Sequence, residues 1–591
     1  MILQALTEYY DRKANDPVDS LAPPGFEWKP IPFIIEITDS GEFLQLEDTR
    51  EQVGKKKVAR SFLVPQTKIR SGVKAYESPN VLWDHYGFVL GYAKRAGKDK
   101  EPLEKDAATA LLQHEYFFKA VESIFSITQD KQVGSVLKFL ESKNFSQVFE
   151  SSAWDECSGI NGCNLSFRVQ CLRNLVCQSP NVIEFVTSSA SNEDVEEDKA
   201  SICLVTGELS AIERLHPAVS GVGEKPAPFS AVNDGSLPAF ASFGKHQGFN
   251  FPVSKQAAFA YSTALNHLLK RDGGQRMQVG DASTVFWAEK KSGLETGVVN
   301  LFGESPKDDP DANVRAVEEL FKSVKNGRYV GEDKDTRFYV LGLAPNAARI
   351  AVRFWHVSTV GQMAERFVQH FEDLKIVHGP KQPEYLSLFR LLVSTASLGK
   401  ADNIPPNLAG DVMRAILEGR PYPQTLLGAA IRRIKAEQDV SYPRAMLIKA
   451  CINRSTRNEN KGTEEELKVS LDENNTNIGY RLGRLFAVLE KAQEEANPGI
   501  NATIRDRYYG SASSSPVTAF STLMKLSKHH IAKLGKGRAI NLERLIGEVL
   551  AEVQDFPAHL NIADQGRFAI GYYHQRQNFF KKSEEKEMIH E

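Results

Sequence analysis

Short apolar runs and helical stripes divide the 591-residue chain at about residue 360. Before that point, residues 31–37 and 43–46 have the composition of strands, and the turn residues 39–41 between them predict a hairpin. From about Val360 the apolar residues recur with the spacing of helices, as in the stripe Met363, Phe367, Phe371 and Leu374. The pattern predicts an α+β fold, with an N-terminal mixed α/β region that contains an antiparallel sheet and a C-terminal all-α helical bundle.

The same pattern suggests three domains. Residues 1–359 form an N-terminal α+β part, residues 360–479 a helical domain, and residues 480–591 a C-terminal helical bundle. The polar stretch 472–479 is expected to link the last two. We also expect an opening helix with Leu3, Leu6 and Tyr10 on one face, helices within 107–142, a strand within 161–169, and a buried aromatic segment at 83–92.

Composition describes a soluble protein with balanced charge. The chain has 73 Lys and Arg residues against 75 Asp and Glu, and 41% of its residues are hydrophobic. This balance excludes a generally basic coat protein, so any nucleic-acid surface must be a local patch. The six cysteines include two pairs separated by five residues, a spacing longer than zinc ribbons and fingers usually use, and they are too sparse for a secreted disulfide domain. Together with the lack of a basic region ahead of an apolar core at the N-terminus and of an apolar run as long as a membrane span, they predict a reduced, cytoplasmic protein.

The strongest local signal is the stretch 54–76, which holds seven basic residues and no acidic one. Its apolar run Phe62-Leu63-Val64 predicts a short strand, with basic loops on either side. The candidate phosphate contacts are Lys55, Lys56, Lys57, Arg60, Lys68 and Arg70, and the candidate base readers are Gln66, Ser71 and Lys74. Gly72 would let the backbone approach a ligand closely. The alternative is a solvated hairpin with surface lysines.

Three further sets of polar residues are candidates for nucleic-acid contact. In the loop 242–250 these are Lys245, Gln247 and Asn250, although a purely structural loop is equally compatible with the composition. Arg349 and Arg353 occupy alternating positions of a predicted strand, where they could face a ligand or pair with local carboxylates. Between residues 505 and 538 lie seven basic residues and one acidic residue on predicted helices, and the candidates there are Arg505, Arg507, Lys528 and Lys533.

Familiar catalytic motifs are absent from the sequence. It contains no Gly-x4-Gly-Lys-Ser/Thr phosphate loop, no Gly-x-Gly-x-x-Gly after a strand, no His-Glu-x-x-His and no Gly-x-Ser-x-Gly. Scattered carboxylates could still converge in three dimensions. The sequence therefore favours a binding protein over an enzyme, without a cofactor or a metal.

Ordered segments along nearly the whole chain resemble the large subunit of the type I-C CRISPR Cascade, a Csd-type CRISPR-associated protein. The segments that carry the resemblance are Met1-Ile-Leu-Gln-Ala-Leu6, Leu21-Ala-Pro-Pro-Gly-Phe-Glu27, Leu46-Glu-Asp-Thr-Arg50, Gly54-Lys-Lys-Lys57, Phe62-Leu-Val-Pro-Gln66, Ser71-Gly-Val-Lys-Ala75, Leu82-Trp-Asp84, Cys203-Leu-Val-Thr-Gly-Glu208, Phe243-Gly-Lys-x-Gln-Gly-x-Asn250, Leu343-Ala-Pro-Asn-Ala-Ala-Arg-Ile-Ala-Val-Arg-Phe-Trp355, Tyr480-Arg-Leu-Gly-Arg-Leu-Phe-Ala-Val-Leu-Glu490 and Ile500-Asn-Ala-Thr-Ile-Arg-Asp-Arg507. The link Tyr76-Glu-Ser-Pro-Asn80 is longer than is usual in the family.

The resemblance implies a non-catalytic subunit of an RNA-guided DNA surveillance complex. Such a subunit reads the protospacer-adjacent motif (PAM) in double-stranded target DNA, promotes unwinding and R-loop formation, and supports the displaced single strand. Its implied partners are the 5′ end of the guide RNA, the Cascade backbone subunits, the guide-end-capping subunit, the small subunit and the helicase-nuclease. The C-terminal part resembles the small subunit, which an internal translation start can also supply. The alternatives are a scaffold that contacts mainly guide RNA and protein neighbours, and an unrecognised metal-dependent nuclease.

Overall fold

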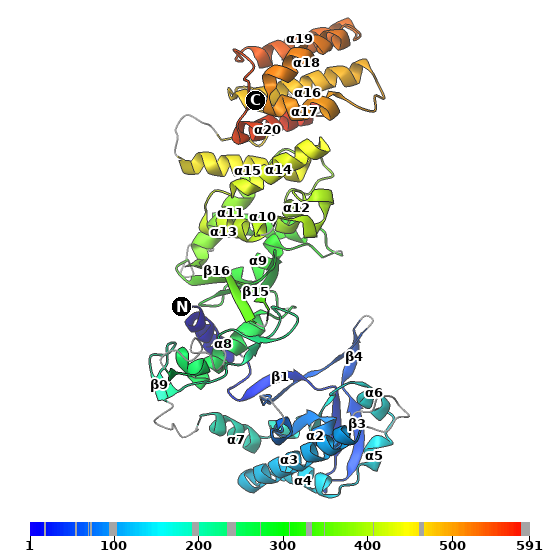
Figure 1. Cartoon of the computed structure of the whole chain (residues 1–591), viewed down its shortest axis with the longest axis vertical. Coiled ribbons are helices and arrows are strands. Elements are labelled where there is room, and N and C mark those ends of the chain that lie inside the picture. Colours follow the sequence, from blue (N-terminus) through cyan, green and yellow to red (C-terminus); the bar gives the residue numbers. More distant parts are fainter. Residues whose placement is uncertain are drawn as a thin grey trace. The chain divides into compact units, whose positions relative to one another are not determined.

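The computed structural model describes residues 1–16, 19–53, 56–68, 70, 74–93, 103–191, 200–232, 244–271, 273–306, 308–326, 334–347, 349–405, 407–459 and 466–580. The chain forms two compact units (Figure 1). The first comprises Met1–Pro217 and Ser230–Leu265, and the second comprises Ala218–Phe229 and Asn266–Glu591.

A four-stranded sheet is the centre of the first unit. Its strand order is β3 (Phe43–Asp48), β2 (Phe33–Ile37), β8 (Asn164–Val169) and β7 (Trp83–His85). β2 pairs with β3 and β7 with β8 in antiparallel fashion, whereas β2 and β8 run parallel. The strand β2 is almost wholly apolar, and all its residues except Glu36 are buried. The predicted hairpin between residues 31–37 and 43–46 is therefore confirmed.

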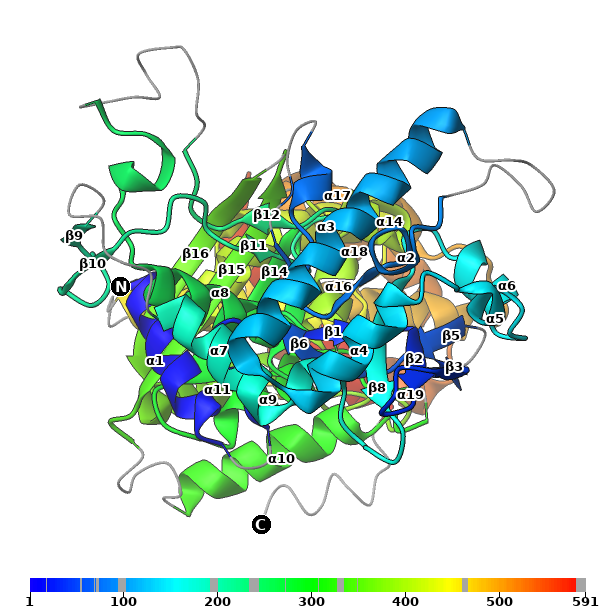
Figure 2. The ribbon, with the colours of Figure 1, turned by 90° about the horizontal axis from the view of Figure 1, so that it is seen from below.

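Two helices bury their apolar sides against this sheet. α3 (Glu104–Thr128) contributes Phe117 and Val121, and α4 (Lys131–Glu141) contributes Val136 and Phe139, to a core shared with the strands. The ring of Phe117 stacks on Phe167 of β8 at a centroid distance of 6.3 Å. Figure 2 shows α3 and α4 beside the sheet. The aromatic segment after β7 belongs to the same core, as the sequence indicated.

Two antiparallel ribbons extend the first unit and carry the basic stretch. β1 (Phe26–Pro30) pairs with β6 (Ser61–Pro65), and β4 (Arg50–Val53) pairs with β5 (Lys56–Ala59). The remaining elements of this unit are α1 (Ile2–Ala14), η1 (Ala75–Glu77), α2 (Tyr86–Leu90), α5 (Ser146–Phe149), α6 (Trp154–Gly159), η2 (Val176–Gln178), α7 (Pro180–Ser191), β9 (Ala200–Ile202), β10 (Leu209–Ala211), η6 (Gln247–Asn250) and α8 (Lys255–Leu268), which continues into the second unit.

The second unit begins with an antiparallel sheet in the order β13 (Arg276–Val279), β14 (Ala282–Ala288), β15 (Arg337–Asn346) and β16 (Arg349–Thr359). One face of it packs against helices α9 (Leu294–Phe302), α11 (Val360–Leu374) and α13 (Leu408–Glu418), and α10 (Ala312–Lys325) packs against α9 and α11. The pairing of β15 with β16 shifts beside Gly342, where Arg353 is the extra residue of a bulge. The short strands β11 (Ala218–Val219) and β12 (Ala227–Pro228) pair with one another.

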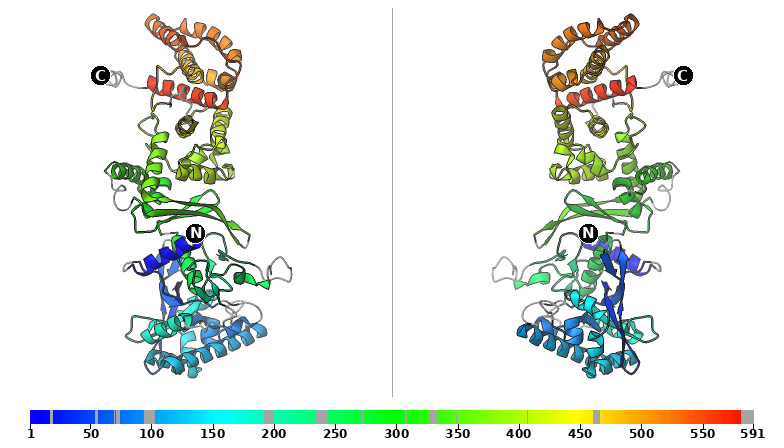
Figure 3. Two further views of the ribbon diagram at one scale, coloured as in Figure 1. Left: turned by 90° about the vertical axis from the view of Figure 1, so that its left-hand side faces the viewer. Right: turned by 90° about the vertical axis from the view of Figure 1, so that its right-hand side faces the viewer.

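Helices make up the rest of the second unit. They are α12 (Leu388–Val393), η7 (Ser397–Gly399), η8 (Ala401–Asn403), α14 (Gln424–Glu437), α15 (Tyr442–Glu459), α16 (Ile478–Ala496), α17 (Ile504–Ser514), α18 (Pro516–Ile531), α19 (Lys536–Leu550) and α20 (Ile562–Phe579). α16 is buried along almost its whole length. Figure 3 shows α20, in red, between the orange helices α17–α19 and the yellow-green helices α14 and α15. The predicted α+β fold with a C-terminal helical bundle is thus confirmed.

Glycines allow α16 and α20 to touch through their backbones. A Cβ atom at Gly483 would lie 2.8 Å from the carbonyl carbon of Phe568 and from the amide nitrogen of Tyr572. A Cβ atom at Gly571 of α20 would lie about as close to the backbone of Tyr480 in α16. Side chains at these positions would force the two helices apart, so this contact fixes their separation.

The stretch expected to link the last two domains packs against α16. The carbonyl oxygens of Asn475 and Glu473 accept hydrogen bonds from Arg481 and Arg484, and Asp472 is buried. The three-domain division stays a prediction. None of the six cysteines forms a disulfide bond. In the part of the chain that the structure describes, no helix is both long and apolar enough to span a membrane.

Candidate nucleic-acid interface

The β4–β5 ribbon carries the first part of the basic stretch. The sequence predicted a loop for Lys56 and Lys57, but both residues lie in strand β5. They can occupy a strand because the ribbon is exposed and Lys57 has acidic partners, with its Nζ 2.6 Å from the Glu156 carboxylate and 3.9 Å from that of Asp48. The side chain of Lys56, and Lys55 entirely, lie outside the described residues.

The charges around Lys57 are balanced. Arg50 bonds to Asp48 at 2.7 Å and also pairs with Glu156, so two cations face two carboxylates. Hydrogen bonds from Lys57 and then Arg50 hold the pKa of Glu156 below its ordinary value. Arg60 lies 3.5 Å from Glu51, and both side chains are largely exposed. A phosphate could replace these surface carboxylates because such exposed pairs are weak.

The second part of the basic stretch is fixed along its backbone. Four successive residues make hydrogen bonds to neighbouring segments: the Pro65 carbonyl accepts from Trp83 Nε1 at 2.8 Å, the Gln66 amide donates to the Gly25 carbonyl at 2.7 Å, the Thr67 amide donates to Glu27 Oε1 at 2.9 Å, and the Lys68 amide donates to Asn80 Oδ1 at 3.0 Å. We call residues 65–68 with these partners the anchored segment. Its side chains therefore start from defined backbone positions.

Arg70 is bound to a buried carboxylate. Its Nη1 donates to Asp84 Oδ1 at 3.1 Å, its Nη2 pairs with Asp84 Oδ2, and its Nε donates to the Ser78 carbonyl at 2.8 Å. The guanidinium carbon also lies 4.1 Å from the centre of the Phe88 ring. The structure thus places Arg70 in a protein contact, whereas the sequence suggested a phosphate contact.

The other predicted members of the stretch differ in how open they are. The side chain of Lys68 is exposed. Partial burial of its ammonium group, and secondarily the charge of Arg70, nevertheless lower the pKa of that group. Lys74 is 75% exposed and lies 3.4 Å from Glu77. Gln66 is half-buried. Ser71 and Gly72 lie outside the described residues.

Trp28 is a surface residue that the sequence did not single out. It lies in β1 between Glu27 and Lys29, whose side chains both bond to Thr67, and 51% of its surface is exposed. Alternation along β1 puts Trp28 on the same side as the buried Phe26, so the pattern itself favours burial. Its exposure depends on what packs against the ribbon, which the sequence does not reveal.

In the loop before α8, two of the three candidates have local hydrogen-bond partners. Gln247 accepts a hydrogen bond from Arg214, and Asn250 donates to the carbonyls of Lys245 and Gln247 at 3.1 Å each. Lys245 is exposed. The loop therefore presents Lys245 on a backbone that the amide side chains hold.

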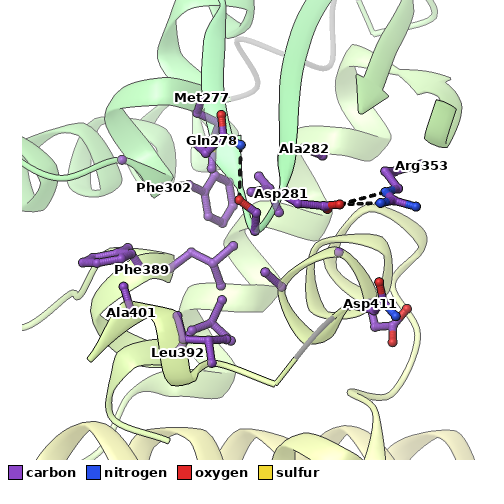
Figure 4. Close-up of a pocket in the computed structure, with 18 of the residues that line it drawn as sticks. Met277, Gln278, Asp281, Ala282, Phe302, Arg353, Phe389, Leu392, Ala401 and Asp411 are labelled. Atoms are coloured by element: carbon purple, nitrogen blue, oxygen red, sulfur yellow. Dashed lines mark hydrogen bonds and ion pairs between the residues drawn. The ribbon is translucent and has the colours of Figure 1, made fainter. Parts of the chain in front are cut away.

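In the second unit, Arg353 pairs with Asp281 and Arg349 is exposed at the start of β16. The bulge at Arg353 interrupts the alternation that would align the two arginines. Arg353 and Asp281 border a cavity of about 1050 Å³ (Figure 4). Apolar side chains such as Phe302 and Leu392 line the cavity. The alternative of a local carboxylate partner is thus the one observed for Arg353.

The C-terminal candidates are divided between buried and open positions. Arg505 is partly buried, and its Nε lies 3.7 Å from the buried carboxylate of Glu490. Arg507 and Lys528 are exposed on α17 and α18, while Lys533 donates to Asn497 at 3.3 Å. Among the described residues, no three His, Cys, Asp or Glu side chains gather as a metal site would require.

In a comparison with known families, residues 6–580 match the model described as CRISPR-associated protein (Cas_Csd1). The chain belongs to the Cas_Csd1 family of CRISPR-associated proteins. Membership in this family agrees with the resemblance noted from the sequence and makes the chain a Cascade subunit. No curated protein sequence matches the chain.

Proposed function

We propose that this Cascade subunit binds target DNA and reads its protospacer-adjacent motif with residues 56–74. The observation that carries the proposal is the anchored segment, which holds Gln66 and Lys68 on a backbone fixed at four successive residues. Reading a base edge requires a donor or acceptor at a defined position, and a fixed backbone supplies one. Lys57, Arg60 and Lys74 lie in the same stretch and supply positive charge for phosphates.

A short motif is sufficient in such a complex because the guide RNA recognises the remaining sequence by base pairing. The protein contributes phosphate neutralisation and a surface for the displaced strand. The exposed side chains of Lys245, Arg507 and Lys528 are our candidates for that surface. We propose that the subunit acts without catalysis, promotes R-loop formation and helps recruit the helicase-nuclease.

The decisive experiment compares Gln66→Ala and Lys68→Ala in the assembled complex. Affinity is measured for duplexes with and without the motif, at several salt concentrations. Gln66→Ala should reduce the preference for the motif by about 1–3 kcal/mol and leave the salt dependence unchanged. Lys68→Ala should weaken binding to every sequence and reduce the slope of log K against log salt by about 1.

A matched control is Lys119→Ala on α3, because Lys119 is also an exposed lysine but lies outside the basic stretch, with its Nζ 2.7 Å from the Glu115 carboxylate. It should change neither the preference nor the slope. If Gln66→Ala and Lys68→Ala both behaved like this control, motif reading by the anchored segment would be refuted. Crosslinks from the stretch to guide RNA alone would favour the scaffold alternative. Metal-dependent cleavage of labelled DNA by the purified chain would show a nuclease.

A further inference from the structure

We propose that Asp84 is a positioning residue for motif reading and that Arg70 acts through Asp84 rather than on a DNA phosphate. The inference rests on the proposed function of the anchored segment. It concerns a carboxylate that touches no DNA in this scheme but fixes the residues that do. Asp84 lies at the centre of strand β7, within the core sheet of the first unit.

The first argument is that the Arg70 guanidinium is already bound to protein groups. Three of its five N–H donors are used, two by Asp84 and one by the Ser78 carbonyl. One face of the guanidinium covers Phe88, and 21% of the side chain is exposed. By contrast, 75% of the Lys74 side chain is exposed. A phosphate that took over the donors bound to Asp84 would have to break a bidentate ion pair with a buried partner, which is costly.

The second argument is the set of bonds that meet at Asp84. Its carboxylate is 2% exposed and accepts four hydrogen bonds: two from Arg70, one from the Asn80 amide at 2.9 Å and one from the His85 amide at 2.8 Å. A buried carboxylate needs such partners to remain charged. Asp84 itself lies in β7, which pairs with β8 in antiparallel fashion.

The third argument is the connection from Asp84 to the anchored segment. Asp84 holds the Asn80 amide, and the Asn80 side chain accepts the hydrogen bond from the Lys68 amide. Asp84 therefore fixes Lys68 through Asn80 and fixes Arg70 directly. The preceding residue, Trp83, bonds to the Pro65 carbonyl. Both ends of the stretch from 65 to 70 are thus tied to residues 80–84.

The test uses the assembled complex with Asp84→Asn, Arg70→Lys and Arg70→Ala. Asp84→Asn preserves volume but presents an amide N–H₂ or a neutral oxygen to Arg70. All three variants should reduce the affinity ratio between motif-bearing and motif-free duplexes about tenfold or more. The slope of log K against log salt should stay at the wild-type value in each. The double variant Asp84→Asn/Arg70→Ala should lower this affinity ratio no further than the more severe of the two single variants does.

Arg60→Ala is the matched control, since Arg60 is an exposed arginine of the same basic stretch and is paired with Glu51. It should lower the salt slope by about 0.9 and keep the motif ratio. The proposal would be overturned if Arg70→Ala behaved like Arg60→Ala, or if Arg70→Lys, which keeps the charge, retained the full motif ratio. Thermal denaturation identifies variants that fail to fold. If Asp84→Asn or Arg70→Ala fails, the motif ratio of Arg70→Lys alone decides the proposal. A wild-type complex without motif preference would instead refute the proposed function.

Discussion

Replacing Gly483 by alanine tests whether backbone contact between α16 and α20 holds the C-terminal helices together. The new Cβ would lie 2.8 Å from two backbone atoms of α20, at Phe568 and Tyr572, and closer still to the Phe568 carbonyl oxygen. Ordinary contacts of a Cβ begin at 3.4 Å, so clearing the two atoms at 2.8 Å requires a separation of 0.6 Å, and clearing the carbonyl oxygen requires more. Backbone atoms cannot rotate away as a flexible side chain can, so the strain spreads along the helix pair.

Overpacking of this kind costs about 1–3 kcal/mol, and a separation of the whole pair adds lost packing contacts. Alanine is the better helix former by about 1 kcal/mol, which opposes the loss. We expect a net loss of about 2 kcal/mol in the free energy of unfolding, measured by urea denaturation of the full chain. Gly547→Ala is the matched control, because that glycine lies in α19 and a Cβ there would meet nothing within 4 Å.

Gly547→Ala should stabilise the chain by up to about 1 kcal/mol. The two substitutions are chemically identical, so their opposite signs isolate the helix contact. If Gly483→Ala shifted the urea midpoint in the same direction as Gly547→Ala, the helices would not need the glycine contact, and the argument from close packing would fail.

Three further substitutions have defined expected results. Trp28→Ala should weaken binding to opened DNA by about 1–3 kcal/mol if the half-exposed indole stacks on a base. The control Leu44→Ala, which removes an exposed apolar side chain in β3, should leave the affinity unchanged, and equal affinities of the two variants in a fluorescence assay would contradict stacking. Lys528→Ala/Lys533→Ala should reduce R-loop stability and its salt dependence without altering motif preference; an unchanged salt dependence would rule out a phosphate contact. Burial, and then the charge of Lys449, lower the pKa of His574 to about 3, so the unfolded state binds more protons than the folded state below pH 6.5. The free energy of unfolding should therefore fall by about 2 kcal/mol between pH 7 and pH 5. In urea denaturation, His574→Gln should remove this part of the loss, and an unaltered pH dependence of the variant would count against the reasoning.

Elements specified by local residues could be predicted from the sequence. The β2–β3 hairpin follows from a turn sequence between two apolar runs, and α11 follows from its stripe of Met363, Phe367 and Phe371. In each of these cases neighbouring residues contain the whole signal.

Features that depend on distant partners could not be predicted. The partner of Lys57 in its strand is Glu156, which lies 99 positions away along the chain. The bulge at Arg353 depends on the register with β15, and the exposure of Trp28 depends on what covers the ribbon. Asp84 has no motif that marks it as the partner of Arg70. The candidate stretch could therefore be located by its charge, whereas the contacts of its individual side chains could be read only from the structure.

The contact between α16 and α20 has a consequence for biosynthesis. α16 becomes fully enclosed when α20 arrives, because α20 supplies the backbone against which Gly479 and Gly483 rest. A ribosome makes α17, α18 and α19 before α20 emerges, so during that time the side of α16 that packs against α20 stays uncovered. During that interval the nascent chain offers a ready surface to a chaperone, and stalled synthesis ahead of Ile562 would leave a product prone to aggregate.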